Sequence, residues 1–247
     1  MEVHHPHHVT HKKKWSEYLL EFFMLFLAVF LGFIAENIRE HNVDREKEKV
    51  YIENVLEDLK ADTTIYSNYT KNNEILFESI DTLVQLIKSP DRNQHVGKLA
   101  YIARMILPKY KALYTTDRTY EQMKSSGDLR LIKNKPVANA MSYYYYSAID
   151  LKKYNDAAFT WGSDYAISMG KIFNAALLLK IIREQREQQA DSTDLLTEDP
   201  VTLNELATSA QYLYGAFLLG EKIGGERNIA AQKLIDLIQK EYHLKNE

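Results

Sequence analysis

The chain has 247 residues, of which 45% are hydrophobic and 26% are charged. This balance is typical of a folded protein, and it argues against both an intrinsically disordered chain and a membrane protein with many spans. The net charge is −3 with acidic and basic residues interleaved, so we expect no nucleic-acid partner. Because the chain has no cysteine, it has no disulfide framework, no thiolate metal site and no thiol nucleophile.

Residues 1–14 are predicted to form a disordered tail rich in His and Lys. Imidazole is a common ligand of transition metals, and five lie close together, namely His4, His5, His7, His8 and His11. Their spacing is irregular and Pro6 interrupts any helix. We therefore interpret metal binding by this tail as adventitious, and we assign no metal site and no cofactor.

Residues 15–36 are predicted to form a transmembrane helix. The run YLLEFFMLFLAVFLGFIA at 18–35 is apolar except for Glu21, and Trp15 lies at interfacial depth. At about 1.5 Å per residue, residues 15–35 span roughly 30 Å, the thickness of the hydrocarbon core of a bilayer. A cleaved signal peptide is disfavoured because Ala35 is followed by residues that continue a helix. A buried core helix is disfavoured because the run has no polar face.

The flanking charges predict the orientation of this span. Three adjacent lysines at 12–14 precede it, and Lys and Arg favour the cytoplasmic side. Basic residues also follow the span, where they reduce the asymmetry; they are Arg39, Arg45, Lys47 and Lys49. We expect a single-pass protein with its N-terminus in the cytoplasm and its C-terminal domain in the periplasm or outside the cell.

One face of the span is predicted to pack against a second helix. Glu21, Ala28, Gly32 and Ala35 follow one another at intervals of seven, four and three residues, which brings them to the same face. Ala28 and Gly32 form a small-xxx-small pattern that lets another helix approach closely. Two interpretations of Glu21 remain open: a carboxylate that reaches the headgroups, or a proton-carrying carboxylate buried against a partner.

Residues 37–247 are predicted to form one helical bundle. Apolar residues recur at steps of three and four from Glu36 to Lys88 without Pro or Gly, so the span continues into a long amphipathic helix that ends at Ser89-Pro90-Asp91. A shorter helix over 96–107 stops at Pro108. Thr116 and Asp117 offer caps for a helix through Met123, with Gly127 in the left-handed position after its end.

The second half of the bundle is predicted to contain another long helix and a last one. Asn134 and Pro136 suit the cap and first turn of a helix that reaches about Gln189, with Gly162 and Gly170 as bends. A polar loop covers 191–200, and Thr202 begins the last helix, with a kink at 224–225. No window alternates with the strand period. The fold class is therefore all-α, with an N-terminal transmembrane helix that continues into an elongated antiparallel helical bundle.

Few residues in the bundle suggest chemistry. GxSxG, GxxxxGK[ST], GxGxxG and HExxH are absent from the sequence, so we expect no enzyme and no catalytic residue. The carboxylate pairs Glu57–Asp58 and Glu184–Glu187 fall opposite the apolar stripe, which predicts a solvated face. In the run 143–146 every residue is Tyr, so some rings leave the core; a contact surface of Tyr143, Tyr145 and Tyr146 is possible beside ordinary core packing.

Three segments are distinctive: FLAVFLGFIAENIREH, KEKVYIENVLEDLKADT and TYEQMKSSGDLRLIKNK. Through them the chain resembles a family of uncharacterised single-span membrane proteins of Gram-negative bacteria. The resemblance implies one N-terminal membrane helix, a helical domain of unknown function and a place in the inner membrane, and it carries no activity. It covers about half of the chain, from the span to the turn at Gly127.

Two functional hypotheses follow. In the first, the chain is a membrane-anchored assembly, scaffold or sensing protein of an envelope complex; its partners are the lipid bilayer and either a second copy of itself or other membrane proteins. In the second, the chain is a single-span subunit of a membrane motor or transport complex, in which Glu21 relays protons.

Overall fold

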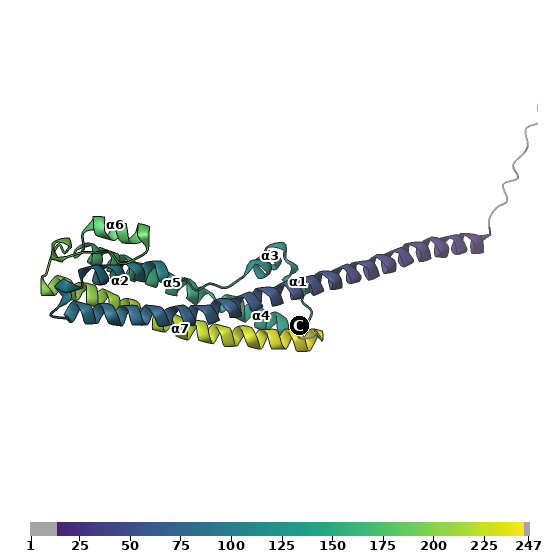
Figure 1. The fold of residues 1–247 in the computed structure, drawn as a ribbon. Helices are drawn as coiled ribbons and strands as arrows, with labels where there is room; N and C mark the ends of the chain where they lie inside the picture. Colours follow the sequence, from purple (N-terminus) through teal and green to yellow (C-terminus); the bar gives the residue numbers. More distant parts are fainter. Residues whose placement is uncertain (1–13, 245–247) are drawn as a thin grey trace, which may run out of the picture. The chain divides into compact units, whose positions relative to one another are not determined.

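The computed structural model describes residues 14–244, and it confirms the all-α fold class (Figure 1). The described part contains no strand; an isolated β-bridge pairs Phe173 with Leu195. The helices are α1 (Trp15–Lys88), α2 (Val96–Lys109), α3 (Arg118–Ser126), α4 (Lys135–Ser147), α5 (Ile149–Gly170), α6 (Ala175–Glu184) and α7 (Pro200–Tyr242). Short 3₁₀ turns at Arg92–Gln94, Asp128–Leu131 and Ser192–Asp194 join some of them.

The chain divides into two compact units, Met1–Val50 and Tyr51–Glu247. In the described part of the first unit, α1 is the sole element, and every side chain from Lys14 to Val43 is exposed. The second unit holds the rest of α1 and the other helices. The two long helices pack together in it, since the rings of Phe77 and Tyr214 lie 4.5 Å apart and Asn73 Nδ2 donates to the carbonyl of Phe217 at 3.3 Å.

Three apolar clusters form the core of the second unit. One joins the end of α1 to α2, α6 and parts of α5 and α7, around Leu99, Phe173 and Leu206. Another joins the residues after Tyr51 in α1 to α3, α4 and the end of α7, around Leu59 and Met141. A small cluster around Tyr66, Tyr69, Leu113, Leu151, Tyr154 and Ala158 forms the third. Figure 1 shows the corresponding grouping: α2, α5 and α6 gather at one end of this unit, and α3 and α4 lie toward the other.

The predicted single helix from 136 to about 189 is wrong. The structure has three helices there, with boundaries at Ala148 and at residues 171–174. The second boundary is stabilised by specific bonds: Asn174 accepts from the N–H of Ala176, and its own N–H donates to the carbonyl of Asp194. The apolar period continues across both boundaries because the three helices contribute to common cores. Periodicity identifies the buried face of a segment, not the places where the helix breaks.

The observed ends of the other helices agree more closely with the ends predicted from the sequence. Helix α1 ends at Lys88 before Pro90, and Gly127 has a φ of 75° after α3. Asn134 caps α4 by accepting from the N–H of Val137 at 3.1 Å. Asp117 precedes α3 without a side-chain cap bond, so that predicted cap is wrong.

Two further predicted boundaries need correction. Pro108 lies within α2, which runs one residue further to Lys109; the proline removes one N–H donor from the last turn, and the helix ends directly after it. Helix α7 begins at Pro200 and not at the predicted Thr202, because Asp199 is its cap and accepts from the N–H of Thr202; the helix runs through residues 224–225 as one element. A Cβ added at Gly224 would lie 3.6 Å from Leu113 Cδ2, an ordinary van der Waals distance, so the packing there does not require glycine.

Candidate functional site

The apolar segment of α1, residues 15–36, is the first candidate site. Its large side chains are exposed, with Leu25 at 70% and Phe33 at 73%. The rings of Phe22, Phe26 and Phe30 stack along one side, with successive centroids 6.3 and 5.9 Å apart. In the part of the chain that the structure describes, α1 is long and apolar enough to cross a membrane. This is compatible with a single-pass membrane protein, as the sequence predicts.

The predicted packing face lies on this segment. Glu21, Ala28, Gly32 and Ala35 are all exposed. A Cβ added at Gly32 would meet no atom within 4 Å, so the helix surface is flat and open there. The helix period brings the four residues to one side of α1. The packing of a second helix on them stays a prediction.

A buried polar cluster in the second unit is the other candidate site, and the sequence analysis missed it. It begins with Asp58 of α1, which is fully buried. Arg118 Nε donates to Asp58 Oδ1 at 2.5 Å, and the N–H of Thr119 donates to Oδ2 at 3.2 Å. The expected solvated pair Glu57–Asp58 is therefore wrong for Asp58, while Glu57 stays 71% exposed. Asp58 ties the start of α3 to α1.

One turn further along α1, Asp62 is also fully buried. Its Oδ1 accepts from the N–H of Thr116 and its Oδ2 from the hydroxyl of Tyr144, both at 2.6 Å. Burial raises the pKa of this carboxyl, and the bonds from Tyr144 and Thr116, with the charge of Arg227, partly oppose the rise. Asp62 thus connects α1 to α4 and to the segment before α3.

Arg227 of α7 completes the cluster, and it is 6% exposed. Its Nη1 donates to the carbonyl of Tyr144 at 2.7 Å and to Ser147 Oγ at 2.6 Å, and its Nη2 donates to Thr115 Oγ1 at 3.0 Å. The guanidinium carbon lies 3.9 Å from the centroid of the Tyr144 ring, a cation–π contact. Tyr144 therefore faces a carboxylate with its hydroxyl and a cation with its ring.

These bonds hold a non-helical strap, residues 110–117, against three helices. Thr115 Oγ1 pairs with the hydroxyl of Tyr66 at 2.8 Å as well as with Arg227. Further along the strap, Asn155 of α5 accepts from the N–H of Leu113 and donates to its carbonyl. Side chains of α1 and α5 satisfy backbone groups of the strap that a helix or sheet would otherwise satisfy internally, whereas Arg227 of α7 bonds to the Thr115 side chain. The cluster is thus a joint between elements.

A second polar contact crosses the bundle at Gly220 of α7. The hydroxyls of Tyr69 and Tyr154 lie 2.5 Å apart, and a Cβ at Gly220 would be 2.2 Å from the Tyr69 hydroxyl. Glycine is thus required at this crossing of α1, α5 and α7. Burial raises the pKa of Tyr110, which lies beside this pair, to about 12. These tyrosines stay neutral and serve packing and hydrogen bonding.

The run of four tyrosines divides between core and surface. Tyr143 and Tyr146 are exposed, at 74% and 77%, so both remain candidates for a contact surface. Tyr145 is 7% exposed and stacks on Tyr120 at a centroid distance of 4.4 Å. The prediction that Tyr145 belongs to the surface is therefore wrong. Two residues on one side of α4 face solvent while Tyr144 and Tyr145 face the other helices.

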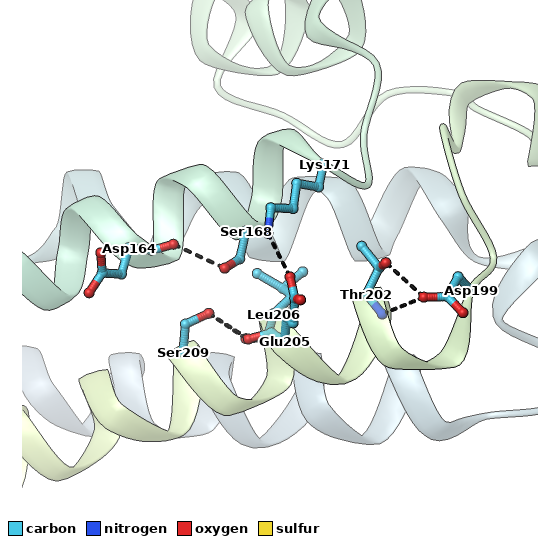
Figure 2. A network of polar contacts seen from close by, with 8 residues as sticks. All are labelled: Asp164, Ser168, Lys171, Asp199, Thr202, Glu205, Leu206 and Ser209. Atoms are coloured by element: carbon cyan, nitrogen blue, oxygen red, sulfur yellow. Dashed lines mark hydrogen bonds and ion pairs between the residues drawn. The ribbon is translucent and has the colours of Figure 1, made fainter.

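At the N-terminal end of α7 the polar contacts lie on the surface (Figure 2). Lys171 Nζ pairs with Glu205 at 2.7 Å between α5 and α7, and Asp199 caps α7 by accepting from the N–H of Thr202 at 2.9 Å. The cap bonds lower the pKa of Asp199. Both partners of the ion pair are about half exposed, so the pair contributes little to stability. This network defines a helix start and a surface contact.

Within residues 14–244, no group of three or more His, Asp or Glu side chains is arranged to hold a metal ion. The five His residues of the N-terminal tail lie outside the described residues. Glu184 of the other carboxylate pair accepts from Arg186 at 2.8 Å on the surface, in agreement with a solvated face.

These features define the class: an all-α protein with one candidate membrane-spanning helix near its N-terminus and a helical unit jointed by buried polar side chains. No family model matches the chain, and no curated protein or solved structure matches it either.

Proposed function

We propose that this chain is a membrane-anchored assembly or sensing protein. The observation that carries the proposal is the contrast in exposure along α1: side chains from Lys14 to Val43 are exposed, whereas Ile52, Val55 and Leu59 are at most 1% exposed. Burying one large apolar side chain contributes about 1.5–3 kcal/mol. The apolar segment therefore gains far more in lipid than in water, and the second unit has its own cores without it.

Membrane extraction tests the anchor. We expect the full chain to stay in the pellet when membranes are washed with alkaline carbonate. Phe26→Arg with Leu27→Arg should release it, because an Arg at mid-span costs about 2.5–3.5 kcal/mol. Ile75→Arg is the matched control, since Ile75 is 52% exposed on the second unit; that variant should stay in the pellet. A wild-type chain that washes off contradicts the anchor.

We propose that the N-terminus is cytoplasmic and that residues 51–247 lie in the periplasm of a bacterium. The lysines at 12–14 support this orientation, and the family resemblance supports the place in a bacterial inner membrane. Alkaline phosphatase fused after Glu247 should be active, because it folds only in the periplasm. An inactive phosphatase combined with a fluorescent cytoplasmic reporter at the same position would reverse the orientation.

Association through the span is the proposed means of assembly. The chain has no cysteine, so single cysteines report without background. Ala28→Cys and Gly32→Cys should give disulfide-linked dimers or one specific adduct in membranes. Phe30→Cys is the control, because it lies about 200° around the helix from Ala28. Equal cross-linking at all three positions, or none at any, removes the proposed face.

We infer a sensing role from the buried carboxylates on α1. Asp58 and Asp62 belong to the same helix as the apolar segment. Their bonds to Thr119, Tyr144 and Thr116 are directional, so a turn of α1 about its axis would break them. A binding event at the membrane segment would in this way loosen the strap. Hydrogen exchange of the amide of Thr116 should then accelerate when cross-links at residue 28 form.

A second candidate role rests on Glu21, the one acidic residue between Tyr18 and Ala35. A carboxylate inside an apolar span on a predicted packing face suits a proton relay in a partner complex. Glu21→Gln should then reproduce the phenotype of a strain that lacks the chain, while the protein still fractionates with membranes. Full complementation by Glu21→Gln would end this role and leave the anchoring proposal untouched.

A further inference from the structure

An apolar cavity lies between α2, α5 and α7 in the second unit. Its volume is about 290 Å³, and it is partly open to solvent. Leu107 and Tyr110 line it from the end of α2 and the residue after it, and Leu213 and Phe217 line it from α7. Helix α5 contributes only small side chains and one ring to it: Ala158, Phe159, Gly162, Ser163 and Ala166.

The cavity exists because the side of α5 that faces it is small. Ala158, Gly162 and Ala166 follow one another at steps of four, which brings them to one face. A Cβ added at Gly162 would meet only Leu107 Cδ2, at 3.4 Å. A larger residue at this position would have filled the space, and an unfilled apolar space lowers stability. The sequence therefore leaves this space open.

The lining has no donor left for a polar ligand group. Seven of the nine lining side chains carry no polar atom, and the other two are Tyr110 and Ser163. The Tyr110 hydroxyl donates to Asn155 Oδ1, and Ser163 Oγ donates to the carbonyl of Phe159. The cavity is therefore suited to a hydrocarbon and unsuited to a sugar, nucleotide or peptide amide, which would lose hydrogen bonds to water.

Two other hollows in the same unit differ in this respect. A groove of about 460 Å³ between α1 and α7 includes Asp81 and Lys88. A groove of about 350 Å³ between α4 and α7 includes Glu226 and Lys233. Neither groove is purely apolar, because each has charged side chains in its lining. The cavity beside Gly162 is the one of these three whose lining carries no charged side chain.

We propose that this cavity binds the acyl chain of a fatty acid or lipid, with the polar headgroup left outside. An apolar cavity of about 150 Å³ already holds benzene, so 290 Å³ accommodates a longer hydrocarbon. Phe159 lines the opening and is 76% exposed, which supplies an apolar rim along which a chain enters. The site is separate from the apolar segment of α1, so it stands or falls independently of the anchor.

Photolabelling of the full chain tests this site. The protein is purified in a steroid-based detergent, which has no alkyl chain to compete. Two probes are used: a fatty acid with a diazirine near its methyl end, and a phosphatidylcholine with the same acyl chain. After irradiation, mass spectrometry should find adducts on α5 between Ala158 and Ala166 and on α7 between Leu213 and Phe217. Labelling of residues 15–36 reports that the probe reached the protein.

Matched variants give the test its specificity. Gly162→Leu fills the cavity and should reduce labelling at α5 and α7 about tenfold. Gly170→Leu is the control on the same helix, because a Cβ there meets no atom within 4 Å and Gly170 does not line the cavity. It should be labelled like the wild type. Ala166→Leu is a second filling variant, so that a folding defect of one variant, detected by circular dichroism, does not decide the result.

The outcomes are distinct. Labelling by the acid alone identifies a free fatty acid as the ligand, and labelling by the phospholipid alone identifies a membrane lipid. Either result, or labelling by both probes, supports the acyl-chain site. Adducts confined to residues 15–36, or equal labelling of Gly162→Leu and wild type at α5 and α7, overturn it. The anchor fails separately, through carbonate extraction, so failure of one proposal is distinguishable from failure of the other.

Discussion

The two parts of α1 have opposite relations to their surroundings. Before residue 44 its apolar side chains are exposed on all sides, as with Leu25 at 70%. After Tyr51 the apolar residues occupy one face, and Leu59 is fully buried. The first part has no protein contacts in the described structure that account for its composition. The second part owes its stability to the helices packed on it.

The polar residues of the two parts also differ in burial. In the second part, Asp58, Asp62 and Asn73 are buried on the apolar face, and each is bonded to another element. Buried polar groups of this kind add directional bonds between elements and are costly when a partner is lost. The comparison teaches that a long helix can expose apolar side chains on all sides over one stretch and be fixed in orientation by hydrogen bonds over another.

The largest expected effect comes from Arg227, which bonds to α4 and to the strap beside these carboxylates. Arg227→Met should lower the free energy of unfolding of the second unit by about 3–5 kcal/mol, because it removes the three hydrogen bonds and the cation–π contact of a buried guanidinium. Denaturant titration followed by tryptophan fluorescence measures it, since Trp161 lies in this unit.

Arg186→Met is the control for Arg227→Met. Arg186 is 74% exposed and pairs with Glu184 on the surface, so its loss should leave the unfolding midpoint unchanged within error. A similar shift in both variants would mean that net charge, and not the buried cluster, stabilises the unit.

The sharpest comparison uses one substitution in both parts of α1. Leu59→Ala should destabilise the second unit by about 2–5 kcal/mol, because it removes buried methyl groups and leaves a cavity. Leu25→Ala should not change the unfolding free energy of that unit, since Leu25 is 70% exposed. Thermal denaturation of both variants in nanodiscs measures the difference. A destabilisation by Leu25→Ala equal to that of Leu59→Ala would break the comparison.

A smaller effect is expected from the titration of Asp62. Its pKa in the fold is raised above the ordinary value of 3.8, chiefly by burial. The folded state therefore binds the proton more tightly than the unfolded chain does, so the contribution of Asp62 to stability falls as pH rises from about 3.8 through the raised pKa. Asp62→Asn should remove this part of the pH dependence.

Unfolding free energies measured from pH 4 to pH 7 test the titration. As pH rises, the unfolding free energy of the wild type should fall relative to that of Asp62→Asn. Asp156→Asn, an exposed position, controls for the change in net charge. A constant gap across the range would mean that Asp62 does not titrate in this window. The groups that face Asp62 are Tyr144, Thr116 and Arg227.

Much of the fold could be predicted from the sequence, because helices leave a strong local signal. The end of α1 at Lys88 followed from Pro90, and the turn after α3 from Gly127. The two boundaries between α4, α5 and α6 could not, because their apolar stripe is unbroken. Tyr145 was misplaced for a related reason: in a run of tyrosines, the sequence does not say which rings meet another helix.

The buried Asp62 and Asn73 were missed, although the sequence carried a signal for them, whereas Asp58 left no such signal. In the predicted apolar stripe of α1, Leu59 is followed by Tyr66 and Tyr69 by Leu76, each at a gap of seven. Asp62 and Asn73 fill these gaps on the buried face. A polar residue at a stripe position predicts a buried hydrogen bond, but its partners, such as Tyr144, lie far along the chain and are fixed only by tertiary packing.

The smallest effect sharpens the comparison at the ends of the helices that pack on α1. Asn134→Ala should destabilise the second unit by about 1 kcal/mol, because the Asn134 side chain accepts from the N–H of Val137 at the start of α4. Asp117→Ala removes a residue in the same position before α3, where no side-chain cap bond is made, so it should have less effect. The sequence alone predicts equal losses for the two variants. Asn134→Ala also removes the bond from Asn134 Nδ2 to Glu241 Oε2 at 2.7 Å, and Glu241→Ala measures that contribution alone. Equal losses for Asn134→Ala and Asp117→Ala in thermal denaturation would mean that Asp117 caps α3 in solution, whereas a loss for Asn134→Ala that exceeds those of Asp117→Ala and Glu241→Ala shows that a cap residue stabilises a helix when its bond forms.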